Sequence, residues 1–328
     1  MADRLIITNG DSAVARMREA GLEADFLPWR DMLHAGPVPK TPSLEELSDI
    51  RARYLAEEFA PDPADVDRGF AERDAAIRNH AKYGRLELWF EHDLYDQLQL
   101  IQILDHFADG RRVIFLVQAN DYLGVMSADA VRALEPAARA VTAEEIEAAT
   151  DAWAAFTAET PERLTAPAAS GRSPLPFLPA ALRRLLAELP AVRSGLSLTE
   201  ERVLAALAAG PRKVGELFKI TQAQEEARFL GDAPFFHGLD GLAFCAAPLV
   251  AGLPFAARRC ARGPSDGDYR AFAGSTVSLT DAGRAALAGT FDHALENGID
   301  RWLGGTHLRR ENLWRRDPRG GIVSPTLQ

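Results

Sequence analysis

Residues 5–39 read LIITNGDSAVARMREAGLEADFLPWRDMLHAGPVP, and two short apolar runs within them each end in a group of polar residues. The first run covers residues 5–8, and after it apolar residues recur at a spacing typical of a helix. The second run covers residues 26–29. This order predicts a strand, a helix whose N-cap is Asp11 or Ser12, and a second strand.

The chain up to residue 156 repeats this alternation. Apolar runs at residues 86–90 and 112–117 predict two more strands, and the second of these is nearly unbroken, as in strands that parallel sheets bury on both faces. Helical spacing and capping residues predict helices that begin near Ser43, Ala64, Leu94, Ala130 and Thr142. Strands that alternate with helices favour right-handed crossovers. We therefore predict an α/β fold in which residues 1–156 form a Rossmann-like domain with a mostly parallel sheet.

The composition changes at residue 157. Residues 157–176 are rich in proline and lack apolar periodicity, which predicts a linker or a segment that wraps around the fold. Residues 177–328 contain several helical patterns, with a capping box at Ser197 and Glu200 and a further N-cap at Thr221. An apolar run, a loop rich in Gly, Arg and Asp, and the sequence TVSLTDAGRAALAG follow. These features predict a second domain that is winged-helix-like and mainly α, with an Arg- and Trp-rich C-terminal tail.

The composition also limits the class of protein. The 328 residues carry a formal net charge of −10, which argues against a protein that coats nucleic acid, since neutralising phosphates requires concentrated Lys and Arg. No apolar run reaches the roughly 18 residues needed to span a bilayer. The N-terminus, with acidic Asp3 and a short apolar segment, differs from a secretory signal, so we expect a cytoplasmic protein with no membrane partner. Cys245 and Cys260 lack zinc-site spacing, and the sequence leaves the oligomeric state open.

Polar side chains follow each of the four predicted strands. Ligands of open α/β sheets bind beyond the carboxyl ends of the strands, so these side chains are expected to share one cleft. A helix N-terminus suits the phosphate or carboxylate of a small anionic molecule, and amide side chains suit a base or sugar edge. The expected ligand-binding residues are Asn9, Gly10, Asp11, Ser12, Gln97 and Asn120. The expected general acids and bases are Asp31, His34 and His92. Carboxylates suit Mg²⁺ or Mn²⁺, and the expected metal ligands are Asp11, Glu91 and Asp93.

These residues allow more than one chemistry. A bound metal that positions a phosphate ester and a water molecule would make the protein a metal-assisted hydrolase. The GDS sequence at residues 10–12 resembles the first block of the GDS-type serine hydrolases, and Asp31 and His34 have the D-x-x-H spacing of their acid and base. This implies a Ser12–His34–Asp31 triad, although in those enzymes the D-x-x-H pair lies near the end of the fold. The alternative is that the polar residues after the strands only cap helices.

The predicted second domain favours a different class, a ligand-sensing transcriptional regulator or a protein-interaction module. A helix that reads DNA should be basic, but residues 221–230 place Glu225 and Glu226 against Arg228. We therefore expect DNA binding to be weak. Residues 301–320 contain six arginines and two tryptophans, and we expect this tail to be ordered, with the tryptophans packed on protein and the arginines facing carboxylates.

Several motifs along the chain resemble one bacterial family. They are NGDSA, WRDMLHAGP, ELWFEHDLYDQLQL, FLGDAPFF, RWLGGTHL and NLWRRDP. Together they resemble the bacterial domain-of-unknown-function family 1835, and the resemblance covers most of the chain. It implies no activity, so the expected function rests on the residues themselves. That function is the binding, and in the enzyme alternative the hydrolysis, of a small anionic or phosphorylated ligand.

Overall fold

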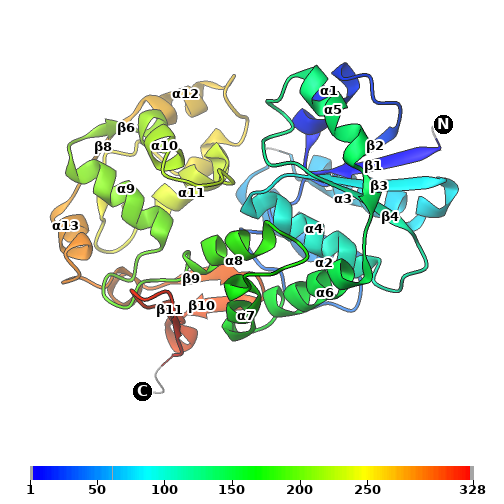
Figure 1. Ribbon diagram of the computed structural model, residues 1–328. Coiled ribbons are helices and arrows are strands. Elements are labelled where there is room, and N and C mark those ends of the chain that lie inside the picture. Colours follow the sequence, from blue (N-terminus) through cyan, green and yellow to red (C-terminus); the bar gives the residue numbers. More distant parts are fainter. Residues whose placement is uncertain (1–2, 61, 326–328) are drawn as a thin grey trace.

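The computed structural model describes residues 3–60 and 62–325. A five-stranded sheet with the order β2-β1-β3-β4-β5 forms the centre of the N-terminal half (Figure 1). Four strands are parallel, namely β1 (Arg4–Thr8), β2 (Asp25–Pro28), β3 (Arg85–Phe90) and β4 (Ile114–Gln118). The predicted α/β class and mostly parallel sheet are confirmed. The antiparallel edge strand β5 (Arg139–Ala140) was not predicted, because its two residues are exposed and form no apolar run.

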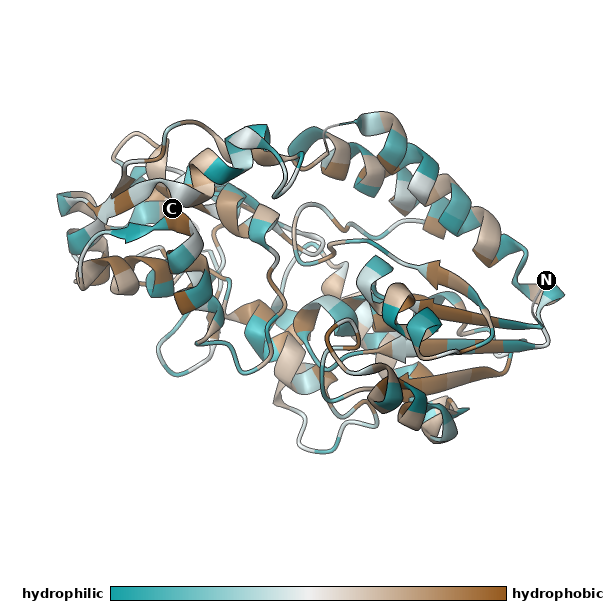
Figure 2. Ribbon diagram, turned by 90° about the horizontal axis from the view of Figure 1, so that it is seen from above, coloured by the Kyte–Doolittle hydropathy of each residue, from teal (hydrophilic) through white to brown (hydrophobic). Residues whose placement is uncertain are grey.

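Helices cover both faces of this sheet. On one face lie α1 (Asp11–Glu19) and α5 (Ala128–Leu134), and on the other lie α4 (Leu94–His106) and α6 (Ala143–Phe156) (Figure 1). Side chains alternate along a strand, so Ile6 packs with α1 and α5, whereas Leu5 and Ile7 pack with α4 and α6. Both faces are therefore buried, and the apolar residues of the strands lie inside the helical layers (Figure 2).

Two further helices, α2 (Leu44–Glu58) and α3 (Pro63–Arg78), follow β2 in the sequence and precede β3. They pack against each other. The predicted helix starts near Ser43 and Leu94 are confirmed. The N-caps are Ser43 and Asp93, and each side chain accepts a hydrogen bond from the backbone N–H three residues later. The prediction for α1 was wrong. Its N-cap is Gly10, because the carboxylate of Asp11 turns away to bind Arg30.

Residues 157–176 fold onto the N-terminal half. They contain the 3₁₀ helix η3 (Glu162–Leu164) and α7 (Thr165–Ala169), and they bury Leu164 and Leu175 in the core beneath the sheet. The following helix, α8 (Leu178–Leu186), packs against α4. This segment therefore wraps around the fold, the second of the two predicted alternatives. The domain boundaries at residues 156 and 177 stay a prediction.

The C-terminal half has a core of its own, which includes Leu204, Leu217 and Phe236. Its helices are α9 (Leu198–Ala208), α10 (Val214–Gln222), α11 (Asp232–Ala243), α12 (Gly267–Gly274) and α13 (Asp281–Leu287). The three-stranded antiparallel sheet has the order β6-β8-β7 and consists of β6 (Arg212–Lys213), β8 (Thr276–Leu279) and β7 (Val250–Ala251). Short 3₁₀ helices occur in both halves. The N-terminal half contains η1 (His80–Lys82) and η2 (Glu135–Ala137), and the later part of the chain contains η4 (Ala257–Cys260) and η5 (Arg310–Asn312).

The predicted helix at residues 221–230 was wrong. Thr221 lies at the end of α10, where its hydroxyl donates to the carbonyl oxygen of Leu217 instead of capping a new helix. The next helix, α11, begins at Asp232, so the segment between α10 and α11 is a loop.

The end of the chain returns to the N-terminal half. After α14 (His293–Glu296), β9 (Asp300–Leu303) and β10 (Thr306–Arg309) form a hairpin, followed by β11 (Arg315–Arg316) and β12 (Ile322–Val323). At the hairpin turn, the carbonyl oxygen of Gly304 accepts from the N–H of Val38, and the N–H of Gly305 donates to the carbonyl oxygen of Phe156, both at 2.9 Å. A Cβ atom at Gly305 would overlap the carbonyl oxygen of Thr157, so this contact requires glycine.

The tail is ordered, as predicted. Trp314 is buried and Trp302 is partly buried. Four of the arginines lie within 3.0 Å of carboxylates, in the pairs Arg301–Glu200, Arg309–Glu311, Arg315–Asp292 and Arg316–Glu201. Within the described residues, no helix combines the length and apolar character needed to cross a membrane.

Candidate functional site

The loop after β2 is held by buried charges. Asp31 is fully buried, and its Oδ1 accepts from Nε of Arg51 at 2.9 Å. The guanidinium of Arg51 also donates to the carbonyl oxygens of Met32, Ala35 and Pro37, so one side chain fixes the path of the loop. The structure thus places Asp31 in a buried ion pair with Arg51, and its acid–base role stays a prediction.

His34 lies in the same loop but is separate from Asp31. Its ring lies 5.2 Å from the ring of Phe229 and 5.9 Å from that of Tyr95, and neither ring nitrogen has a hydrogen-bond partner among the described residues. Burial, helped by the positive charge of Arg51, lowers the pKa of His34 to about 3. The imidazole is therefore neutral, and the implied Ser12–His34–Asp31 triad is absent because His34 bonds to neither partner.

The start of α1 is an exposed ion pair. Both carboxylate oxygens of Asp11 accept from Arg30, at 2.6 and 2.8 Å, and these hydrogen bonds lower the pKa of Asp11. Arg30 has a φ of 59°, the left-handed conformation that non-glycine residues rarely adopt. Ser12 is exposed. Asp11 already neutralises the cation nearest to this helix N-terminus, and it would repel an incoming anion.

Three buried carboxylates, Glu91, Asp93 and Asp96, form what we call the carboxylate cluster. Each can place one oxygen within 4.8 Å of the others. The end of β3 supplies Glu91, and the N-cap and first turn of α4 supply Asp93 and Asp96. Asn9 donates to Oδ2 of Asp96 at 2.9 Å, which joins the end of β1 to the cluster. The sequence had predicted two of these acids, but Asp96 takes the place expected for Asp11.

The charges of the carboxylate cluster are poorly compensated. Burial and the charge of Asp93 raise the pKa of Glu91 to about 7, and burial raises that of Asp93 to about 6. The pKa of Asp96 is also raised, by burial and by its two neighbours. The three groups therefore remain partly protonated near neutral pH unless a cation joins them. Oxygen ligands of this kind suit Mg²⁺ or Mn²⁺.

The other predicted residues lie around the carboxylate cluster or outside it. Gln97 is buried, and its Nε2 donates to the carbonyl oxygen of Glu91 at 2.7 Å, so it supports the chain there. His92 is partly buried and lies 5.2 Å, ring to ring, from Tyr122. Asn120 is exposed. None of the three belongs to the group of carboxylates that could hold a metal.

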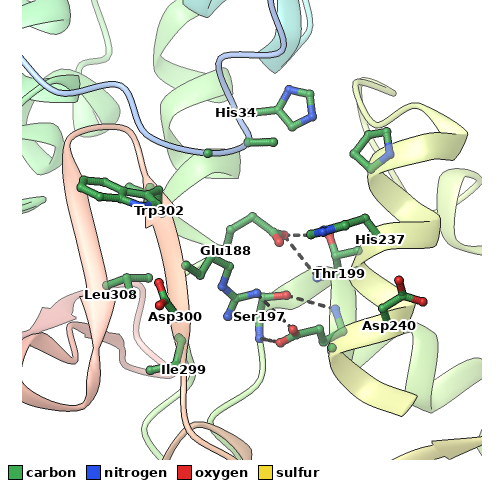
Figure 3. Close-up of a pocket in the computed structure, with 18 of the residues that line it drawn as sticks. His34, Glu188, Ser197, Thr199, His237, Asp240, Ile299, Asp300, Trp302 and Leu308 are labelled. Carbon is green, nitrogen blue, oxygen red and sulfur yellow. Dashed lines mark hydrogen bonds and ion pairs between the residues drawn. The ribbon is translucent and has the colours of Figure 1, made fainter. Parts of the chain in front are cut away.

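A cavity of about 1140 Å³ separates the N-terminal half from the C-terminal half, and we call it the central cavity (Figure 3). Its walls come from the loop after β2, from α2, α9 and α11, and from the β9–β10 hairpin. Among the predicted site residues only His34 lines it. The labelled lining residues are His34, Glu188, Ser197, Thr199, His237, Asp240, Ile299, Asp300, Trp302 and Leu308.

Ion pairs and aromatic rings organise the walls of the central cavity. Oε2 of Glu58 on α2 lies 2.8 Å from Nε2 of His237 on α11, so this pair joins the two halves. Burial opposes the ionisation of Glu188, but the charge and hydrogen bond of Arg184 outweigh it and lower the pKa of Glu188 to about 2. The indole of Trp302 stacks on His307 at 4.2 Å.

The sequence alone does not predict this cavity, because its walls come from segments that lie far apart in the sequence. A helical pattern near residue 58 carries no sign that it will face residue 237.

No protein-family model matches this chain, and no curated protein is similar to it. The resemblance to family 1835 therefore stays a prediction.

Proposed function

We propose that this protein binds a small organic molecule in the central cavity. The observation that carries this proposal is the cavity itself, about 1140 Å³ in volume and walled by both halves of the chain. Ligand pockets of proteins typically measure about 300 to 1,000 Å³ and often lie between domains. The lining also contains His34, a partly buried side chain whose two ring nitrogens are shielded from solvent and have no hydrogen-bond partner among the described residues. A ligand that pairs with it would remove a cost of about 1–3 kcal/mol.

We further propose that the two halves are a Rossmann-like and a winged-helix-like domain. The crossovers between β1, β3 and β4 support the first assignment. The chain order α9, β6, α10, α11, β7 and β8, with the three strands in one sheet, supports the second. In a winged helix, α11 would occupy the position that reads DNA. Its sequence, DAPFFHGLDGLA, contains no Arg or Lys, and it lines the central cavity.

The loop before α11 also argues against DNA binding. Glu225 lies in the segment that the sequence predicted as the recognition helix, and its carboxylate accepts hydrogen bonds from Arg184 and Arg202. Arg228, the one arginine there, lies over the ring of Tyr122 in the N-terminal half, 5.0 Å from its centroid. These charges are used within the molecule, which favours a ligand-binding role for this region over a DNA-binding one.

Filling the central cavity tests the proposal. Gly238 on α11 lines the cavity, and a Cβ atom there meets nothing within 4 Å, so the backbone tolerates the side chain that Gly238→Trp adds to the cavity wall. We expect some members of a library of amines, carboxylic acids, nucleosides and sugar phosphates to raise the melting temperature of the unmodified protein. A ligand at 100 times its Kd adds about 2.7 kcal/mol, which is roughly 5 to 10 °C for a unit of 150 to 250 residues.

The expected result is that Gly238→Trp abolishes these shifts. The matched control is Gly267→Trp, which adds the same side chain to α12 in open space outside the cavity and should leave the shifts unchanged. Ligands that stabilise both variants equally would show that they bind elsewhere.

A second candidate function is the metal-assisted hydrolysis of a phosphorylated ligand at the carboxylate cluster. It is favoured by the three convergent carboxylates, which could hold Mg²⁺ or Mn²⁺ and a water molecule. The test is Mn²⁺-dependent release of phosphate from p-nitrophenyl phosphate. Asp93→Asn should abolish the activity, whereas Asp129→Asn, which changes an exposed acid in the first turn of α5, should keep it. Activity without Mn²⁺, or activity retained by Asp93→Asn, would contradict this candidate.

A further inference from the structure

The charged groups around the central cavity are mostly acidic. The lining contains the carboxylates of Glu57, Glu58, Glu188, Glu200, Asp240 and Asp300, but only two guanidinium groups, those of Arg53 and Arg301. An anion that entered would meet an excess of like charge.

Ion pairs within the wall do not remove this excess. Arg184 lies 2.6 Å from Glu188, and Arg301 lies 3.0 Å from Glu200, so these two carboxylates are neutralised. Glu58 and Asp300, by contrast, pair with the imidazoles of His237 and His307. An imidazole compensates a carboxylate fully only when it is protonated.

Aromatic faces lie beside these carboxylates. Phe59 follows the end of α2, Trp302 lies on the hairpin, and both are partly exposed. Tyr54 and Phe229 also line the cavity, but Arg51 and Arg184 already lie over their rings. The stacked ring of His307 supports one face of Trp302. Aromatic faces attract cations, and they do so more strongly where carboxylates lie nearby and water is excluded.

His34 adds a specific polar contact to this wall. Its neutral ring offers one donor and one acceptor nitrogen, and both are buried without partners in the described parts of the chain. The acceptor nitrogen can receive an N–H, whereas a ring of fixed charge could not do so.

We infer that the central cavity takes an organic cation, an ammonium group on a flat apolar body, and disfavours the corresponding carboxylate. The aromatic walls pack against the body, while Glu58 and its neighbours attract the ammonium group. This inference rests on the proposed function and makes it more specific. The inferred ligand is opposite in charge to the anionic ligand that the sequence predicts at the carboxyl ends of the strands, a different site.

Calorimetric titration with three indoles tests the inference on the intact protein. Tryptamine carries an ammonium group on a two-carbon chain, indole-3-propionate carries a carboxylate on the same chain, and indole is neutral. We expect tryptamine to bind at least about tenfold more tightly than indole-3-propionate at low salt, with a preference that decreases as salt is added.

A charge variant provides the second measurement. Replacing both acids in Glu57→Gln/Glu58→Gln should weaken tryptamine binding by about two- to thirtyfold, because partly exposed pairs contribute up to about 1 kcal/mol each, while indole affinity stays the same. Glu23→Gln, an exposed acid before β2, is the control and should change neither affinity.

The outcomes separate this inference from the proposed function. If indole-3-propionate binds as tightly as tryptamine, and Gly238→Trp blocks both, the charge inference fails and the cavity remains a ligand site. If tryptamine binding survives Gly238→Trp, the proposed function fails with it. An absence of tryptamine binding at millimolar concentration also overturns the inference.

Discussion

Replacing Arg51 by Met removes the side chain that holds the loop carrying His34. Arg51 is fully buried and bonds to the carboxylate of Asp31 and to three backbone carbonyl oxygens. In the variant, the nearest remaining cation to Asp31 is Arg73, whose Nη1 lies 3.9 Å from Oδ2. That distance is too long for a hydrogen bond.

The expected loss follows from the buried charge. Breaking a buried ion pair from one side costs about 3–5 kcal/mol, because the remaining charge stays desolvated and unpaired. For a cooperative unit of 150 to 250 residues this lowers the melting temperature by roughly 6 to 20 °C. The carbonyl oxygens left without a donor place the expected value in the upper part of that range.

Urea unfolding followed by tryptophan fluorescence measures the change. Asp31→Asn should also destabilise the protein, and the double variant should lose less than the sum of the two single losses, with a coupling of about 0.5–3 kcal/mol. Arg53→Met on the same helix is the matched control, because Arg53 is exposed, and it should change stability by no more than about 0.5 kcal/mol. Equal stability of Arg51→Met and Arg53→Met, or strict additivity in the cycle, would refute this account of the loop.

Three other perturbations have definite outcomes. Gly305→Ala should lower the free energy of unfolding by about 1–3 kcal/mol, because the hairpin must leave the carbonyl oxygen of Phe156. The control is Gly274→Ala, where a Cβ atom enters open space. Equal stability of the two variants would contradict the hairpin contact. The raised pKa values of the carboxylate cluster mean that the folded protein holds protons that the unfolded chain releases, so the cluster's contribution to stability is lost as pH rises from about 4 to 7. Glu91→Gln/Asp93→Asn should flatten that part of the stability-against-pH curve, and an unchanged curve would count against the buried cluster. Deleting the chain from Arg301 onward should lower the melting temperature by at least several degrees, since Leu303 and Trp314 lose their burial; an unchanged melting curve would show the tail to be a solvated arm.

The elements predicted correctly are those set by local sequence. The apolar runs of β1, β3 and β4 and the caps at Ser43 and Asp93 depend on neighbours within a few residues, so the sequence alone identifies them. Thr221 shows the limit of this reasoning. A threonine can cap a helix or bond backwards to the carbonyl four residues earlier, and the path of the following loop decides which one occurs.

The candidate sites depend on contacts that no local pattern encodes. Asp11 and Asp96 are both acids near a strand end. Asp96 occupies the place in the carboxylate cluster that was expected for Asp11, because Arg30 binds Asp11 while Asn9 binds Asp96. Asp31 looks like a catalytic acid in the sequence, since nothing nearby indicates that Arg51 will bury it. The central cavity requires the whole chain to be folded before it exists.

The most direct test of the central claim is a crystal structure of the intact protein soaked with the ligand that stabilises it most strongly in the library screen. We expect ligand density inside the central cavity, between α11 and the β9–β10 hairpin and within contact distance of His34 and Trp302. Density instead over Glu91 and Asp93 at the carboxyl end of β3, with the central cavity filled by water alone, would contradict it.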